Sequence, residues 1–224
     1  MYPGLLHREE TMNERSFEIF RREKFFRKEG GLTFCRNVGI TAKDLAFYET
    51  SEPLSYYSHS KQTPQNILVL ENKDTFFDIR RHMNTGCDHD QILGKRFGTV
   101  IYGAGKGIWK TFADYVNGAE PYFLGDNTVF YFGDLDYEGI LIYEHLQERY
   151  PDNHIHIFRE AYETMLDKAL QIGFSNLPEM KEKQNGNIGT AFLDTFDDIR
   201  KSQICEILGM GRYIPQEILN VHDW

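Results

Sequence analysis

The sequence lacks a long apolar run, since no stretch approaches the ~18–20 consecutive apolar residues that a membrane helix needs. Its first residues also lack the layout of a secretory signal peptide. The only cysteines are Cys35, Cys87 and Cys205, and without Cys-x-x-Cys spacing they favour neither a disulfide framework nor a zinc knuckle. These absences predict a protein of a reducing, cytoplasmic setting with no membrane partner.

The sequence also has no excess of positive charge. Its 25 Lys and Arg residues are outnumbered by 34 Asp and Glu residues, which gives a formal net charge of −9. This balance argues against a generic nucleic-acid coat. The charge is unevenly spread, with a net charge of +1 over residues 1–64 and −10 over residues 65–224. The first segment contains the densest basic cluster, with Arg21, Arg22, Lys24, Arg27 and Lys28. The cluster suits a DNA backbone, and it suits a solvated helix face at least as well.

What the sequence does contain is a pair of carboxylates directly after an apolar segment. Val129 to Phe132 is apolar, aromatic and β-branched, which is typical of a strand buried on both faces of a parallel sheet. Asp134 and Asp136 follow two positions apart, and such residues project to the same side of an extended chain. Adjacent carboxylates repel unless a proton or cation lies between them, and hard oxygen ligands suit Mg²⁺ or Mn²⁺. Asp-rich turns are also common after strands, so the pair alone favours a metal site and a plain turn about equally.

Strands and helices alternate after residue 64. We expect strands at residues 66–70, 98–102, 129–132 and 154–158. Helices are expected at residues 74–83, 108–116, 139–150 and 161–170. This alternation predicts an α/β fold of parallel βαβ units with right-handed crossovers, in which ligands bind beyond the carboxyl ends of the strands. Glu71, the loop 103–107 and the two aspartates all lie at those ends.

The flanking segments are predicted to be mostly helical. Further helices are expected at residues 14–28, 40–48 and 190–208. Surface connections are expected at residues 51–64 and 174–189. The predicted domains are a helical N-terminal arm with its connection (1–64), a catalytic α/β domain (65–173) and a helical C-terminal extension (174–224).

Two motif interpretations are weakened by departures from their patterns. The loop 103–107 is not a phosphate-binding loop of the usual kind, because position 100 is Val and Lys106 is followed by Gly. A tight turn is therefore favoured over a nucleotide site. A phosphatase with an aspartyl nucleophile would have a hydroxyl residue two places after the second Asp, where this chain has Glu138.

Several short motifs carry a resemblance when taken together in chain order. They are Glu14-Arg-Ser-x-Glu-Ile-Phe20 with Glu23-Lys24, Leu70-Glu-Asn72, Tyr102-Gly-Ala-Gly105, Gly133-Asp-Leu-Asp-Tyr-Glu-Gly139 and Ile214-Pro-Gln-Glu-Ile218. This set resembles the C-terminal part of the JetD family, the nuclease subunits of Wadjet anti-plasmid systems, which are related to the topoisomerase VI A subunit. Glu71 with the Asp134-x-Asp136 pair also resembles the Toprim signature of topoisomerases, primases and several nucleases.

The resemblance implies a Toprim-like parallel sheet of about four strands that cleaves DNA phosphodiesters with Mg²⁺ or Mn²⁺. It implies that Glu71, Asp134 and Asp136 are catalytic and hold the metal, with Glu138 as a weaker further ligand. Lys73 and Lys106 are expected to contact phosphate, together with Arg21, Arg22, Arg27 and Lys28 of the basic cluster. The implied partners are DNA and subunits of an SMC-like complex, with a homodimer as an option.

Two alternatives stay open beside this interpretation. One is a non-catalytic DNA-binding or assembly subunit, and the other is a Toprim primase or RNA-processing nuclease. The resembled proteins also carry a winged-helix DNA-binding region before the Toprim domain, and residues 1–64 are too few to form it. A truncated relative, a fragment, or a separate chain that supplies the DNA-binding half is therefore expected.

Overall fold

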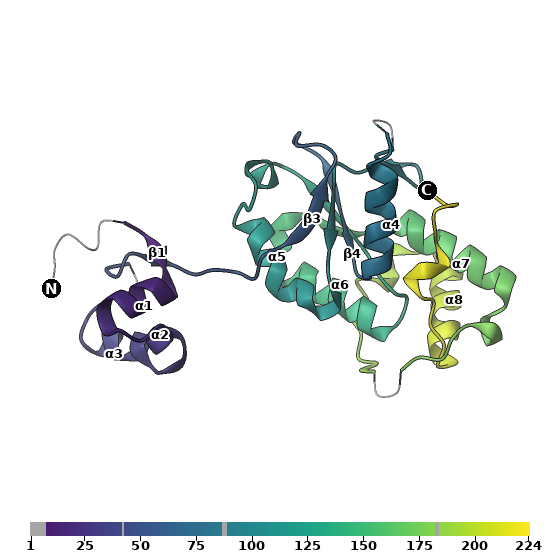
Figure 1. Ribbon diagram of the computed structural model, residues 1–224. Coiled ribbons are helices and arrows are strands. Elements are labelled where there is room, and N and C mark those ends of the chain that lie inside the picture. Colours follow the sequence, from purple (N-terminus) through teal and green to yellow (C-terminus); the bar gives the residue numbers. More distant parts are fainter. Residues whose placement is uncertain (1–7, 42, 87–88, 182–183) are drawn as a thin grey trace. The chain divides into compact units, whose positions relative to one another are not determined.

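The computed structural model describes residues 8–41, 43–86, 89–181 and 184–224. The chain divides into two units, Met1–Ser51 and Glu52–Trp224 (Figure 1). Each unit has an apolar core of its own, one around Met12, Phe26, Cys35 and Leu45 and the other spread over the sheet and helices of the larger unit.

The first unit consists of short elements. They are β1 (Glu10–Thr11), α1 (Met12–Phe20), α2 (Phe25–Lys28), α3 (Gly31–Asn37) and β2 (Phe47–Tyr48). Thr11 and Glu14 form a capping box that starts α1. The two strands pair in parallel, with Thr11 opposite Tyr48.

The predictions of two helices in this unit are wrong. The helix expected over residues 14–28 is broken, because Arg21 takes the left-handed conformation (φ 55°). The buried Ser16 hydroxyl donates to the Arg22 carbonyl (2.6 Å) within that turn. The turn places Phe25 and Phe26 against Phe20, with ring centroids 4.5 and 5.6 Å apart. The helix expected over 40–48 is replaced by a turn and β2, since Phe47 and Tyr48 pair with β1.

The larger unit is built on one five-stranded sheet, in the order β3-β7-β4-β8-β9. The strands are β3 (Ser55–Ser58), β4 (Asn66–Leu70), β7 (Thr99–Tyr102), β8 (Thr128–Phe132) and β9 (Ile155–Ile157). The four expected strands pair in parallel, which confirms the predicted α/β fold. β3 is a fifth strand, antiparallel to β7, so the expectation that residues 51–64 form only a surface connection is wrong.

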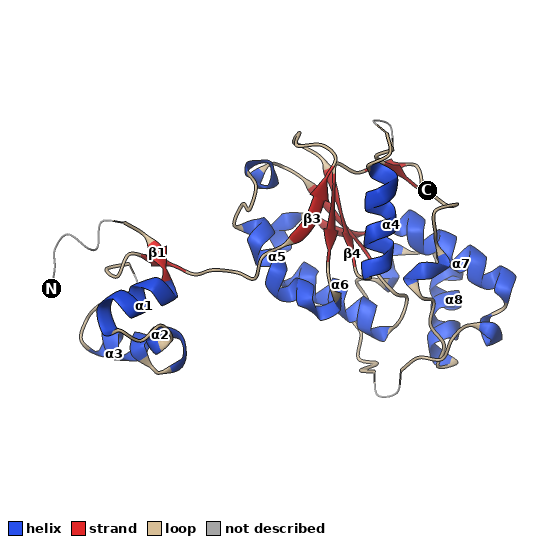
Figure 2. Cartoon of the chain, viewed as in Figure 1, coloured by secondary structure: helices blue, strands red, loops and turns tan. Residues whose placement is uncertain are grey.

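Helices cover both faces of this sheet (Figure 2). They are α4 (Lys73–Met83), α5 (Ile108–Val116), α6 (Tyr137–Arg149), α7 (Arg159–Ile172) and α8 (Asp198–Gly209). Tyr131 of β8 faces Tyr143 of α6, whereas the next residue, Phe132, faces Tyr162 of α7. Side chains alternate across a strand, so α6 and α7 lie on opposite faces. β4 is buried on both faces of the sheet, since Ile67 through Leu70 are fully inaccessible to solvent.

Shorter elements complete the unit. A two-stranded hairpin is formed by β5 (Gln91–Ile92) and β6 (Lys95–Arg96). Short 3-10 helices lie at Gly105–Gly107, Pro121–Leu124, Pro151–Asn153, Phe174–Asn176, Leu193–Thr195 and Gln216–Ile218 (η7). The C-terminal residues share the core of the sheet, with Ile204, Ile207 and Ile214 fully buried. In Figure 1 this segment is yellow and runs beside α7.

Candidate acidic site at the carboxyl edge of the sheet

Two neighbouring parallel strands end at the same level. Leu70 of β4 is in register with Phe132 of β8, so Glu71 and the segment Asp134–Asp136 leave the sheet side by side. The Glu71 backbone N–H donates to the Phe132 carbonyl (3.0 Å), which carries the pairing one residue further. The sheet register therefore brings together the strand ends that carry the three predicted catalytic carboxylates.

The Glu71 carboxylate is enclosed between two glycines. A Cβ on Gly133 would overlap Glu71 Oε2, and a Cβ on Gly139 would lie 3.2 Å from the same oxygen. Tyr131, fully buried in β8, donates its hydroxyl to Oε2 (2.7 Å). Glycine at positions 133 and 139 thus leaves the space that the glutamate occupies.

Asp134 is held through one of its two oxygens. Oδ1 accepts from the Gln216 backbone N–H (2.7 Å) and from the Asn72 side-chain amide (3.0 Å). Oδ2 accepts no hydrogen bond within the part of the chain that the structure describes. The same Asn72 amide also donates to Glu217 Oε1 (3.1 Å), so a further carboxylate lies next to Asp134.

Asp136 has a structural role as well as a candidate ligand role. It is the N-cap of α6, because Oδ1 accepts from the Gly139 backbone N–H (2.7 Å). Its other oxygen accepts from the Gln184 side-chain amide (2.6 Å). The side chain is 8% exposed, so its negative charge is largely removed from water.

Burial and mutual repulsion weaken the acidity of two of these groups. Burial, together with the hydrogen bond from Tyr131, which opposes it, and the neighbouring charges of Asp134 and Asp136, which add to it, raises the pKa of Glu71 to about 7. Burial also raises the pKa of Asp134 to about 6, with Asp136 and Glu217 acting in the same direction and the Gln216 N–H opposing them. Negative charge is therefore costly in this cluster.

The donor chemistry of this cluster fits a hard divalent cation, since it offers carboxylate oxygens whose charge is uncompensated. Among the described residues, however, no three acidic, histidine or cysteine side chains already surround one point as ligands. Glu71, Asp134 and Asp136 each accept hydrogen bonds from protein groups instead. That the three share a cation stays a prediction.

The remaining predicted site residues lie apart from this cluster or at its margin. Glu138, in the first turn of α6, pairs with Lys106 (3.3 Å), and both side chains are about half exposed. Lys73 begins α4 and is exposed. Glu138 and Lys106 thus have each other as partners. The metal role of Glu138 and the phosphate contacts of Lys73 and Lys106 stay predictions.

The basic cluster belongs to the first unit and is partly paired with acids. Arg22 pairs with Glu29, and Lys24 pairs with Glu23 (2.7 Å). Arg21 lies over the Phe17 ring (5.9 Å). Arg27 and Lys28, in the last turn of α2, are exposed and form no ion pair among the described residues. These last two cations are the best placed to meet an external anion.

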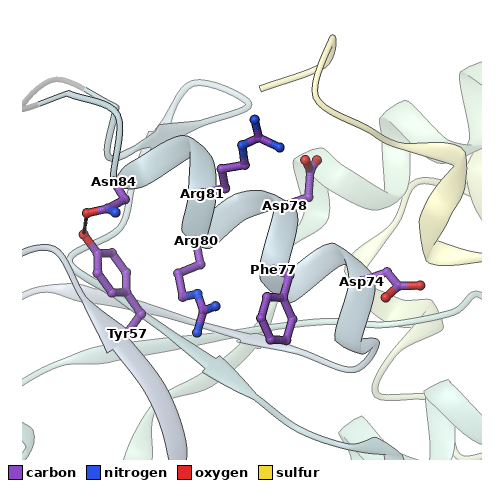
Figure 3. A pocket seen from close by; sticks show the side chains of 7 residues that line it. All are labelled: Tyr57, Asp74, Phe77, Asp78, Arg80, Arg81 and Asn84. Carbon is purple, nitrogen blue, oxygen red and sulfur yellow. Dashed lines mark hydrogen bonds between the residues drawn. The ribbon is translucent and has the colours of Figure 1, made fainter.

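A separate groove of about 720 Å³ runs along α4 and does not include the carboxylates of the site. Figure 3 shows Phe77 and Arg80 projecting to one side of the helix, where the guanidinium lies 4.2 Å from the Phe77 ring centroid. Tyr57 of β3 donates to Asn84 across one end of the groove (3.4 Å). Arg81 and two aspartates complete a lining of mixed charge that selects no single ligand.

Sequence reasoning missed the residues that hold the carboxylates in place. They are Asn72, Tyr131, Gln184 and Gln216, with Glu217 as an additional acid. Asn72, Gln216 and Glu217 lie within motifs that carry the resemblance, and this was the available signal. Gln216 contacts Asn72 from 144 positions away, and no periodic pattern in the sequence indicates such a contact.

The mostly parallel sheet with flanking helices, and acidic residues at its carboxyl edge, define the larger unit as an α/β domain consistent with a Toprim-like fold. The family described as Wadjet protein JetD, C-terminal, matches residues 26–203, and the chain therefore belongs to that family. Membership implies a component of Wadjet anti-plasmid defence that works within a multi-subunit complex.

The other comparisons add no relative. No curated protein and no solved structure is significantly similar to the chain. In the part of the chain that the structure describes, every helix is too short or too polar to span a lipid bilayer.

Proposed function

We propose that this chain is a Mg²⁺- or Mn²⁺-dependent DNA-cleaving subunit that acts with SMC-like subunits of a Wadjet complex. The observation that carries the proposal is the meeting of Glu71 with the Asp134–Asp136 segment at one sheet edge, in a chain of the JetD family. Ligands of parallel α/β sheets bind at this edge, which supports a catalytic use of the cluster.

The residues would divide the chemistry among them. Asp134 and Asp136 would hold the cation, and Asp134 Oδ2 is the oxygen without a protein donor in the described part of the chain. A bound divalent cation polarises a phosphoryl oxygen and stabilises the negative charge that develops during in-line attack. Glu71 would complete the coordination, or would take a proton from water or give one to the leaving oxygen.

The test is cleavage of supercoiled plasmid by the purified chain with Mn²⁺ or Mg²⁺, alone and with its complex subunits. We expect nicked or linear product from the wild type and none from Asp134→Ala. Asp126→Ala is the matched control, because Asp126 precedes the opposite end of the same strand and its side chain is 92% exposed. Equal cleavage by Asp134→Ala and the wild type would reject the proposed site.

A non-catalytic assembly subunit is the second candidate. The observation that favours it is that each of the three carboxylates accepts hydrogen bonds from protein donors, and that among the described residues the three do not surround one point as ligands. This function predicts that Asp134→Ala leaves plasmid defence intact in cells. The nuclease function predicts that defence is lost while the variant still assembles with its partner subunits.

A further inference from the structure

Residues 214–216 pack against the segment that carries Asp134 and Asp136. Ile214 pairs with Leu135, which lies between the two candidate ligand aspartates, through hydrogen bonds of 2.9 Å and 3.2 Å. This short antiparallel bridge places η7 beside the exit of β8. Gln216, the first residue of η7, is fully buried there. Gln216 lies outside residues 26–203, the range that the family model matches.

Every polar group of the Gln216 side chain bonds to a strand end. Its Oε1 accepts from the Asn72 backbone N–H (2.9 Å), just after β4. Its Nε2 donates to the carbonyl of Phe132 (3.1 Å), the last residue of β8. The side chain therefore ties together the two strands that carry the carboxylates.

The backbone of the same residue fixes one of those carboxylates. The Gln216 N–H donates to Asp134 Oδ1 (2.7 Å), and Asn72, which the side chain anchors, donates to the same oxygen. Two donors on Oδ1 set the rotation of the carboxylate. They leave Oδ2 without a protein donor in the described part of the chain.

We propose that Gln216 is a positioning residue that orients Asp134 toward its ligand. The inference rests on the proposed function, because it concerns the same carboxylates. A buried amide whose two hydrogen bonds both end on the strand ends of the site does more than fill space, since an apolar residue of equal size would fill it without needing partners. Groups that orient metal ligands typically change metal affinity by about 10- to 100-fold when they are removed.

The test is the affinity of the full chain for Mn²⁺ alone, measured by titration calorimetry, for wild type, Gln216→Met and Gln147→Met. Gln147 is the matched control because its amide also donates to a strand carbonyl, that of Ile155 (3.0 Å), away from the acidic site. We expect Gln216→Met to bind Mn²⁺ about 10- to 100-fold more weakly and Gln147→Met to bind it as the wild type does. Circular dichroism establishes that each variant is folded at the temperature used.

If Gln216→Met does not fold, Gln216→Asn tests the same point, because it keeps a buried amide that is one methylene too short to reach both strand ends. Unchanged Mn²⁺ affinity in the folded variant would overturn the positioning role and leave the metal site standing. A wild type that binds Mn²⁺ but cleaves no DNA would overturn the nuclease proposal and leave the positioning role standing. A wild type that binds no Mn²⁺ would overturn both.

Discussion

At the residue scale, neutral donors hold the carboxylates of the site. Hydroxyl, amide and backbone N–H groups from Tyr131, Asn72, Gln216, Gly139 and Gln184 supply the hydrogen bonds. None of these groups carries a positive charge, so the repulsion between the acids is left in place. That repulsion has a consequence for the stability of the metal-free protein.

The metal-free protein should lose stability as the pH rises from about 4 to 7. The pKa of Glu71 is raised from 4.5 to about 7 and that of Asp134 from 3.8 to about 6, so the folded state binds more protons than the unfolded state in this window. The stability that these two carboxyl groups contribute is fully present below their pKa values in the unfolded state. It is lost as the pH rises through their pKa values in the folded state. At about 1.4 kcal/mol per pKa unit, either shift alone corresponds to a loss on the order of 3 kcal/mol.

Urea unfolding in EDTA at several pH values measures this loss. Glu71→Gln keeps an acceptor for Tyr131 without the charge, so its free energy of unfolding should fall less between pH 5 and pH 8. Mn²⁺ should restore the wild type at pH 8. Superimposable pH curves for the wild type and the variant would show that Glu71 does not carry the effect.

The site could be predicted from the sequence only as far as the strands determine it. Glu71, Asp134 and Asp136 follow apolar segments that are recognisable as buried strands, and parallel pairing places their ends at one edge. Gln216 contacts Asn72 from 144 positions away, and Gln184 contacts Asp136 from 48 positions away. Such contacts depend on tertiary packing, which a local pattern does not encode.

At the scale of elements, the buried parallel strands and the helices that follow them were predicted correctly, and weaker local patterns were not. The helix expected over residues 190–208, for example, begins only at Asp198. β4 and β8 appear as continuous apolar segments because both faces are covered. β3 was missed, since Ser55–Ser58 is polar, flanked by Ser and Pro, and lies at a sheet edge. The break between α1 and α2 was missed because the buried hydroxyl of Ser16 and the packing of three phenylalanines override a helical pattern.

The dual role of Asp136 can be separated by substitution. Asn is as good an N-cap as Asp, so Asp136→Asn should keep the stability of α6 and lose Mn²⁺ affinity. Asp136→Ala should also lose about 1 kcal/mol of unfolding free energy. Asp197→Ala is the control, because Asp197 caps α8 through Arg200 N–H (2.8 Å) and should cost similar stability without affecting metal binding. Wild-type metal affinity in Asp136→Asn would show that the residue acts only as a cap.

The start of α6 should not tolerate a side chain at Gly139. A Cβ there would overlap the Asp134 carbonyl oxygen and lie 3.2 Å from Glu71 Oε2. We expect Gly139→Ala to destabilise the protein by about 1–3 kcal/mol in urea unfolding and to weaken Mn²⁺ binding. Gly209→Ala, in α8 with no atom within 4 Å of its added Cβ, should be nearly neutral in both measurements. Equal effects of the two substitutions would contradict the close packing at Gly139.

At the scale of the whole molecule, charge divides unevenly along a chain of two units. The sequence carries its acidic excess after residue 64, whereas the basic cluster lies in the unit Met1–Ser51. Each unit has a separate apolar core. A protein with a net charge of −9 needs a local region where a phosphate backbone is tolerated if it is to handle DNA. Within the cluster, Arg27 and Lys28 are exposed and form no ion pair among the described residues, so they are the first candidates for such a contact.

The last prediction is that Arg27 and Lys28 contact the DNA backbone. Neutralising phosphates releases counterions, so duplex affinity should fall with salt by a log–log slope of about −0.9 per phosphate neutralised. Replacing Arg27 and Lys28 with Gln should weaken binding for all sequences alike and flatten the slope by about 0.9 for each phosphate that is no longer bound. Arg22 is a poorer target, because its pairing with Glu29 already offsets its charge.

Fluorescence anisotropy of a labelled duplex at several salt concentrations measures both quantities. The control replaces Arg36 and Lys43 with Gln, because both are exposed cations of the same unit outside the cluster and the change in net charge is identical. A slope that flattens equally in both variants would mean that only the overall charge of the unit matters. Salt curves that coincide for the wild type and both variants would reject the DNA contact and favour a protein–protein role for this helix.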